Sequence, residues 1–87
     1  MQTWNFLFTR KAVSDLKQIL KSGSIRERVK VILEDIAKDP RSGIGKPERL
    51  KFRKNESWSR RIDSKNRVEY IIDQNTVTIV SILGHYE

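Results

Sequence analysis

The sequence predicts an α+β domain: an N-terminal strand, then two helices packed on one face of a mainly antiparallel sheet of about four to five strands. Three observations predict this class. Apolar and polar residues alternate at the start of the chain and again through its second half, which is typical of strands. Between these regions apolar residues recur every three or four positions, as along one face of a helix. A stretch rich in glycine and charge separates the two halves.

The first strand is expected at residues 3–8, where three aromatic side chains alternate with smaller ones. Helical spacing then begins and continues over residues 12–20. Thr9 is the expected N-cap of this helix, and Gly23 is the expected glycine at its C-terminal end.

A second helix is predicted from an apolar stripe over residues 25–36. Ser24 and Glu27 have the spacing of a capping box, in which each side chain bonds the backbone N–H of the other residue. Pro40 ends the helix because it cannot continue the hydrogen-bond pattern.

The second half is predicted to be an antiparallel meander of three or four strands. Residues 41–47 form a loop, and a short strand starts near Glu48 with Leu50 and Phe52 pointing inward. Further strands are expected at residues 58–62, 67–72 and 76–83.

Composition limits the classes of protein that remain. The chain has 87 residues, 37% apolar and 33% charged, and we expect one domain over residues 1–87. It has no cysteine and one histidine, which excludes a disulfide scaffold, a thiolate zinc site and a histidine-rich metal site. No metal and no cofactor are expected. No run approaches the roughly 20 apolar residues of a membrane span. We expect no secretory signal and a cytoplasmic location.

Positive charge is concentrated in the middle of the sequence. Residues 41–67 carry ten Lys or Arg and three Asp or Glu, a net charge equal to the +7 of the whole chain. Such a block attracts polyanions, and nucleic acid is the first candidate. An acidic protein partner would satisfy the same block, and a solvated surface that only aids solubility is a further interpretation.

Three residues have the types that cleavage of an RNA phosphodiester needs. Glu48 can act as a base, Arg67 can stabilise charge on the phosphate, and His85 can act as an acid near neutral pH. Their spacing does not show that they meet, although neighbouring antiparallel strands could bring them together. The residues thus indicate a metal-independent ribonuclease, with a non-catalytic RNA-binding module as the alternative.

Four segments, in order, resemble the YoeB/Txe branch of the RelE toxin superfamily. They are Gly45-Lys46-Pro47-Glu48-x-Leu50-Lys51, Trp58-Ser59-Arg60-Arg61-Ile62, Asn66-Arg67-Val68-x-Tyr70 and His85-Tyr86. The resemblance implies the RelE-like fold and a bacterial type II toxin that cleaves mRNA, typically in the ribosomal A site, and so inhibits translation. It implies three partners: the ribosome, mRNA and a small antitoxin. The basic surface predicts that the antitoxin has an acidic C-terminal segment, and both a monomer and a homodimer of this chain remain open.

The same resemblance assigns the catalytic roles. Glu48 resembles the general base, Arg67 the phosphate-stabilising cation and His85 the general acid, while Tyr86 would position the substrate. The products would be a 2′,3′-cyclic phosphate and a 5′-hydroxyl. The family generally ends at the His-Tyr pair, whereas Glu87 follows here and adds a negative charge near the proposed acid.

Contacts to the RNA backbone are assigned to Lys46, Lys51 and Arg61. Arg60 and Arg61 are adjacent and therefore point to opposite faces of a strand. Arg60 shares its face with the apolar residues of that strand, so Arg61 is the better candidate for the site.

Two other functions are compatible with the fold. ParE-like relatives act on DNA gyrase, but they would not need the Glu-Arg-His-Tyr set. A toxin without catalysis that only occupies the ribosome is the other alternative.

Overall fold

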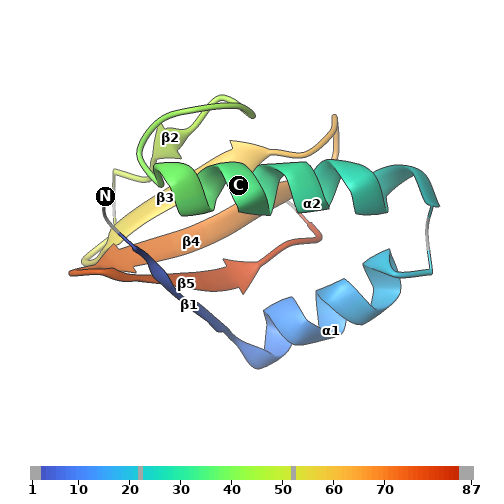
Figure 1. Cartoon of the computed structure of the whole chain (residues 1–87), viewed down its shortest axis with the longest axis horizontal. Coiled ribbons are helices and arrows are strands. Elements are labelled where there is room, and N and C mark those ends of the chain that lie inside the picture. The colour runs from blue at the N-terminus through green and yellow to red at the C-terminus, as the bar shows by residue number, and fades with distance from the viewer. Residues whose placement is uncertain (1–2, 22, 52, 85–87) are drawn as a thin grey trace.

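The computed structural model describes residues 3–21, 23–51 and 53–84. Two helices pack against a five-stranded, mostly antiparallel sheet, which confirms the predicted class (Figure 1). The elements in chain order are β1 (Asn5–Phe8), α1 (Arg10–Ile19), α2 (Gly23–Lys38), β2 (Glu48–Arg49), β3 (Glu56–Arg61), β4 (Arg67–Asp73) and β5 (Thr76–Ser81).

The strands follow the order β1-β5-β4-β3-β2 across the sheet. β2 to β5 form an antiparallel meander, whereas β1 pairs with β5 in parallel, with Asn5 opposite Thr76 and Phe8 opposite Ile79. The first and last strands in chain order, β1 and β5, are therefore neighbours in the sheet, while β2 forms the opposite edge.

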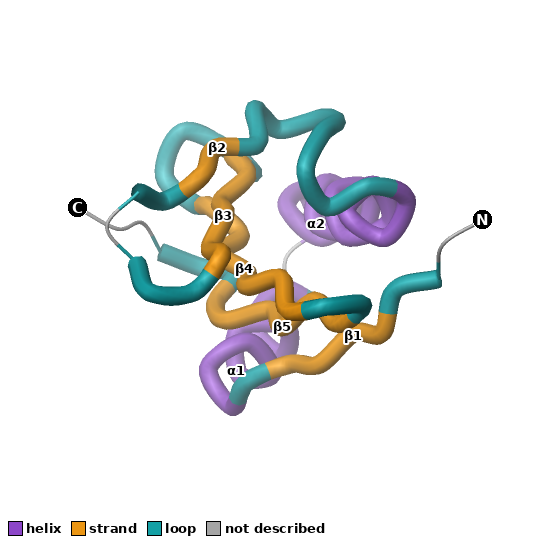
Figure 2. Tube along the Cα trace, turned by 90° about the vertical axis from the view of Figure 1, so that its left-hand side faces the viewer, coloured by secondary structure: helices purple, strands orange, loops and turns teal. Residues whose placement is uncertain are grey.

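The helices occupy different places around the sheet. α2 lies along one face of the sheet (Figure 1). α1 contacts β5 and β1, the two strands at the edge of the sheet opposite to β2. Seen at 90°, α2 lies on one side of the strands and leaves the opposite side of β3 and β4 without a helix (Figure 2). Among the described residues, neither helix has the length and apolar character needed to cross a membrane.

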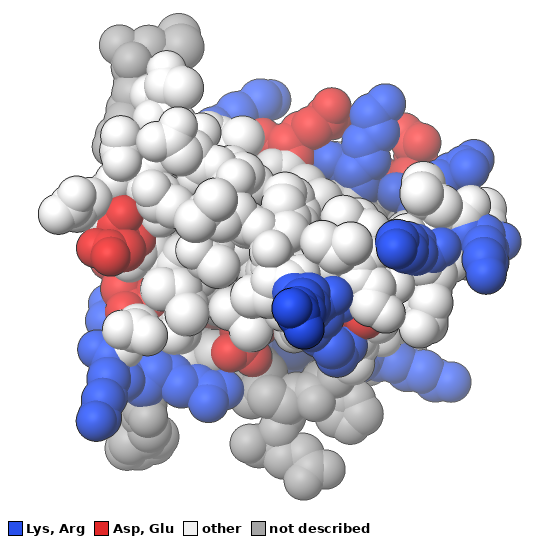
Figure 3. Space-filling model, turned by 90° about the horizontal axis from the view of Figure 1, so that it is seen from below, with Lys and Arg blue, Asp and Glu red and all other residues white. Residues whose placement is uncertain are grey.

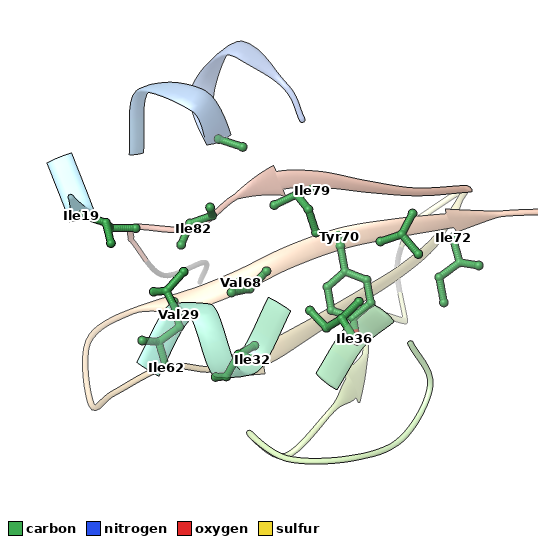
Figure 4. Packing of buried hydrophobic residues seen from close by; sticks show 12 residues of the cluster. Ile19, Val29, Ile32, Ile36, Ile62, Val68, Tyr70, Ile72, Ile79 and Ile82 are labelled. Atoms are coloured by element: carbon green, nitrogen blue, oxygen red, sulfur yellow. The ribbon is translucent and has the colours of Figure 1, made fainter. Parts of the chain in front are cut away.

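The core forms between α2 and the sheet. Val29, Ile32 and Ile36 of α2 point toward Val68 and Tyr70 of β4, and all five are at most 2% exposed (Figure 4). Their spacing is that of the apolar stripe predicted for this helix.

The first helix begins as predicted, but the connection between the helices differs. The Oγ1 atom of Thr9 accepts a hydrogen bond from the N–H of Ala12 at 3.1 Å, which confirms the N-cap. Gly23 does not end α1: Leu20 is the C-cap, and Gly23 is the first residue of α2. The predicted capping box is also wrong, because Ser24 lies inside α2. Gly23 does not have the positive φ of a C-terminal glycine, so it can start a helix instead.

β2 is shorter than predicted. It contains only two residues, although the N–H of Leu50 still donates to the carbonyl of Ser57 at 2.8 Å. Leu50 is 6% exposed, as expected, while Phe52 lies outside the described residues.

Apolar side chains reach the surface on β1 and α1. Leu7, Phe8 and Val13 are between 38% and 59% exposed. From below, uncharged residues occupy much of the middle of the surface, and Lys and Arg lie mainly around them (Figure 3). This face differs from the open face of the sheet, where the predicted site residues gather.

Candidate active site

Strand pairing brings four charged residues onto the face of the sheet that α2 leaves open. In register, Glu48 of β2 lies opposite Ser59 of β3, and Ser59 lies opposite Glu69 of β4. One step along the same face, Arg61 lies opposite Arg67. Paired residues point to the same side of a sheet, so these five side chains share one face.

The predicted base and cation thus lie two strands apart, with β3 between them. Glu48 and Arg61 are exposed and Arg67 is half-buried, whereas the small side chain of Ser59 between them is completely covered. Adjacent strands are about 4.8 Å apart, so two strand spacings separate the backbones that carry Glu48 and Arg67.

Glu69 adds an acidic group to this face that the sequence prediction did not include in the site. Its Oε2 atom lies 3.7 Å from Nη2 of Arg53, and its side chain is 20% exposed. The signal that could have placed it is its position in β4, two residues after Arg67 and therefore on the same face.

The other predicted RNA contacts flank β2. Lys46 lies two residues before Glu48 and Lys51 two residues after the end of the strand, and both are exposed. Lys46 has a φ of 52°, in the left-handed region that few non-glycine residues adopt.

A buried arginine holds the loop that leads to Glu48. Arg60 is 0% exposed, and its Nη1 atom donates to Oδ2 of Asp35 at 2.6 Å and to the carbonyl of Ile44 at 3.2 Å. Its Nη2 atom donates to the carbonyls of Asp39 and Ser42 at 2.6 and 2.8 Å. This confirms that Arg60 faces the core and Arg61 does not.

Tyr70 completes this cluster. The Nε atom of Arg60 donates to the Tyr70 hydroxyl at 3.0 Å, which in turn donates to the carbonyl of Pro40 at 2.7 Å. Burial raises the pKa of Tyr70. The N–H of Ile44 and the guanidinium of Arg60 both bond the Asp35 carboxylate and lower its pKa. The buried charge of Arg60 is therefore paired with Asp35, and all of its N–H groups donate hydrogen bonds, as burial of a charged group requires.

Gly45 lets the loop approach β3. The N–H of Arg61 donates to the Gly45 carbonyl at 2.6 Å, and Gly45 has a φ of 79°. A Cβ atom at this position would lie 2.9 Å from the Arg61 carbonyl oxygen. Only glycine fits here without strain, and the contact fixes the chain three residues before Glu48.

The end of the described chain is bound beside Arg67. The N–H of Arg67 donates to the carbonyl of Gly84 at 3.1 Å, and the N–H of Gly84 donates to Oδ1 of Asn66 at 2.9 Å. His85 and Tyr86 follow Gly84 in the sequence but lie outside the described residues. Within residues 3–21, 23–51 and 53–84, no three acidic or histidine side chains cluster as metal ligands.

Comparison with known proteins identifies the family. Residues 8–86 match the sequence profile described as "YoeB-like toxin of bacterial type II toxin-antitoxin system". The chain belongs to the YoeB family of type II toxins. Toxin YoeB of Synechocystis is 43% identical over 61 residues, which cover 70% of this chain and 71% of that protein. Toxin YoeB of Streptomyces coelicolor is 40% identical over 62 residues, covering 71% and 74%.

Solved structures of YoeB proteins have the same fold. A YoeB dimer from Staphylococcus aureus superimposes with a TM-score of 0.84 at 31% identity and covers 97% of this chain and 99% of its own. YoeB in the heterotetrameric YoeB-YefM complex from the same organism gives a TM-score of 0.81 at 32% identity, covering 95% and 98%. The resemblance predicted from the four sequence segments is therefore confirmed.

Proposed function

We propose that this YoeB-family toxin is a metal-independent endoribonuclease that cleaves mRNA in the ribosomal A site and so inhibits translation. One observation carries the proposal: Glu48 and Arg67, which come from separate sequence motifs, share the open face of the sheet with Arg61. Gly84, the residue to which His85 is joined, is bound to the backbone of Arg67.

The reaction uses these groups in three roles. Glu48 removes the proton of the 2′-hydroxyl, whose oxygen attacks the neighbouring phosphorus. Arg67 stabilises the negative charge that builds on the phosphate oxygens. His85 gives a proton to the departing 5′-oxygen, and Tyr86 positions the substrate. The new O2′–P bond replaces the P–O5′ bond, which yields a 2′,3′-cyclic phosphate and a 5′-hydroxyl.

The exposed cations around β2 and β3 would hold the RNA backbone. Lys46, Lys51 and Arg61 lie close to Glu48 in sequence or in the sheet, and all are exposed. The role of this group is electrostatic, because each phosphate contact releases counterions and carries no sequence information.

A small antitoxin with an acidic C-terminal segment is the proposed partner in the cytoplasm. A YoeB from S. aureus forms a heterotetrameric complex with YefM, and a YoeB dimer from the same organism has also been solved. The excess positive charge of this chain favours an acidic partner. The exposed apolar side chains Leu7, Phe8 and Val13 are candidates for contacts in either assembly.

The test is cleavage of mRNA on translating ribosomes, with the ends of the products identified chemically. We expect Glu48→Gln, Arg67→Ala and His85→Ala each to reduce the cleavage rate by about 10²–10⁴-fold while ribosome binding changes little. EDTA saturated with Mg²⁺ keeps the ribosomes intact and still removes transition metals, and it should leave the rate unchanged.

Lys30→Gln is the matched control, since it removes an exposed charge from α2 on the other side of the sheet. Products with a 3′-hydroxyl and a 5′-phosphate would overturn the mechanism. Ribosome binding without any cleavage by the unaltered chain would favour the non-catalytic alternative instead.

A further inference from the structure

The Asp15 carboxylate in α1 is buried and lies far in sequence from the motifs that identify the family. Its side chain is 4% exposed, and its Oδ2 atom accepts the N–H groups of Ile82 and Leu83 at 2.9 and 3.0 Å. Lys11 donates to both carboxylate oxygens at 2.7 and 2.8 Å. A buried charge is costly unless such partners surround it, so this carboxylate has a specific structural role.

The pKa of Asp15 agrees with this geometry. Burial alone would raise the pKa, but the hydrogen bonds from Lys11, Ile82 and Leu83 outweigh burial and lower it. The side chain is therefore a carboxylate at neutral pH and acts only as an acceptor.

The bonds of Asp15 continue into a series that fixes the chain up to Gly84. Lys11 also donates to the carbonyl of Leu83 at 3.2 Å. Gly84 is bound on both sides, through its N–H to Asn66 and through its carbonyl to the N–H of Arg67. β5 ends at Ser81, so these bonds replace the strand pairing that would otherwise hold the segment.

We propose that Asp15 is a positioning residue: by fixing the backbone of Ile82 and Leu83, it holds Gly84, the residue from which His85 continues, beside Arg67. The inference rests on the proposed ribonuclease function, in which the next residue, His85, supplies the proton. Asp15 itself touches no substrate. Displacing a catalytic group by about 1 Å can cost 10²-fold in rate, so loss of this anchor should be felt in the chemical step.

The first experiment measures the anchor without any activity. Amide hydrogen exchange of Ile82 and Leu83 is compared in the unaltered chain, in Asp15→Ala and in Ile36→Val. Ile36 is a core residue beside Tyr70, distant from Ile82, and serves as the control for general loss of stability (Figure 4). We expect exchange of these two amides to rise at least about tenfold in Asp15→Ala, measured against amides of β4 in the same sample. An equal rise in Ile36→Val would overturn the anchor.

Asp15→Asn serves as the conservative variant and covers the case in which Asp15→Ala does not fold. Its amide oxygen can still accept both N–H groups, although the charge pair with Lys11 is lost. We expect Asp15→Asn to raise the exchange of Ile82 and Leu83 by less than about tenfold over the unaltered chain, measured against amides of β4 in the same sample. A larger rise in folded Asp15→Asn would contradict the hydrogen-bond role.

The second experiment measures single-turnover cleavage of mRNA bound to ribosomes. Asp15→Ala should lose at least about tenfold in rate at saturating ribosomes, with less than a twofold change in ribosome affinity. In a His85→Ala background the same substitution should cost less than twofold, because the group that it positions is gone. Equal losses in both backgrounds would indicate a general defect and overturn the positioning role.

The two proposals fail in different ways. If the unaltered chain binds ribosomes but does not cleave, the ribonuclease function is overturned, while the exchange experiment still decides whether Asp15 anchors the chain end. If the unaltered chain cleaves and folded Asp15→Ala cleaves equally fast, only the positioning role is overturned.

Discussion

The loop at residues 39–47 and the chain end at residues 82–84 are each held by one buried charged side chain, but with opposite polarity. Arg60 donates all of its guanidinium N–H groups, and three of the acceptors are backbone carbonyls of the loop. Asp15 only accepts, and two of its donors are backbone N–H groups of the chain end. In both segments a side chain binds backbone that is not held by the hydrogen bonds of a continuing strand or helix.

The difference lies in how each charge is neutralised. Arg60 is fully enclosed and pairs with Asp35, so water cannot replace the hydrogen bonds that Arg60 makes with the groups around it. Asp15 pairs with Lys11, whose side chain is 59% exposed, so water can substitute for part of that pair. We infer that the loop anchor is built into the core, whereas the chain-end anchor can be weakened without unfolding the protein.

The largest effect should come from Arg60→Leu. It leaves a half-buried carboxylate, several carbonyls and a tyrosine hydroxyl without their donor, and removing the buried partner of an ion pair costs about 3–5 kcal/mol. Urea unfolding measures the loss. Arg61→Leu, at the exposed neighbour, is the control and should change the free energy of unfolding by no more than about 0.5 kcal/mol. Similar losses in both variants would contradict the distinction between the two faces.

Gly45→Ala should have the next largest effect on the loop side. The substitution adds a Cβ atom 2.9 Å from the Arg61 carbonyl at a φ of 79°, and such strain costs about 1–3 kcal/mol. Gly23→Ala is the matched control, because among the described residues no atom outside its chain neighbours and the backbone of its own helix lies within 4 Å of the added Cβ. It should be neutral or stabilising by up to about 1 kcal/mol, since alanine is the less flexible residue in the unfolded chain. Thermal unfolding distinguishes these outcomes.

Acid should loosen the start of the loop through Glu56. Its two carboxylate oxygens accept from Nε and Nη2 of Arg41 at 2.7 and 2.9 Å, and these bonds lower its pKa from 4.5 to about 2. The stability that Glu56 contributes is therefore fully present above pH 4.5 and is lost as the pH falls from 4.5 toward 2. Glu56→Gln should remove this part of the pH dependence when unfolding is followed from pH 6 to pH 2. An unchanged slope would contradict the pairing with Arg41.

The smallest effect is expected for Lys11→Gln on the chain-end side. An ion pair with one largely exposed partner is worth at most about 1 kcal/mol, and high salt should reduce the difference further. Equilibrium unfolding at low and high salt measures it. A loss as large as that of Arg60→Leu would mean that the two anchors do not differ as inferred.

Local signals in the sequence predicted most of the fold. The N-cap at Thr9 and the strand faces around Arg60 and Arg61 depend only on neighbouring residues, and both are confirmed. Gly23 was misassigned because a glycine between two helices can end the first or begin the second, and only the backbone conformation decides. The parallel pairing of β1 with β5 could not be predicted in this way, because it joins segments far apart in the sequence.

The residues in and around the candidate site also divide into those that the sequence could predict and those that it could not. Glu48, Arg61 and Arg67 could be predicted because their motifs resemble a family, and β-strand alternation then places them on one face. Neither the loop role of Arg60 nor the buried position of Asp15 could be predicted, because each depends on contacts between segments distant in sequence. Contacts of this kind also occur outside the site: the hydroxyl of Thr9 donates to the carbonyl of Val80, 71 residues away in the sequence.

The pairing of β1 with β5 also determines the order in which the protein can fold. The first strand to be synthesised has its partner in the last one, and α1 packs on that same last strand. Non-local pairings of this kind form slowly, because the long intervening chain must be ordered before any contact is gained. During synthesis, β1 and α1 therefore remain without their partner until residues 76–81 have emerged.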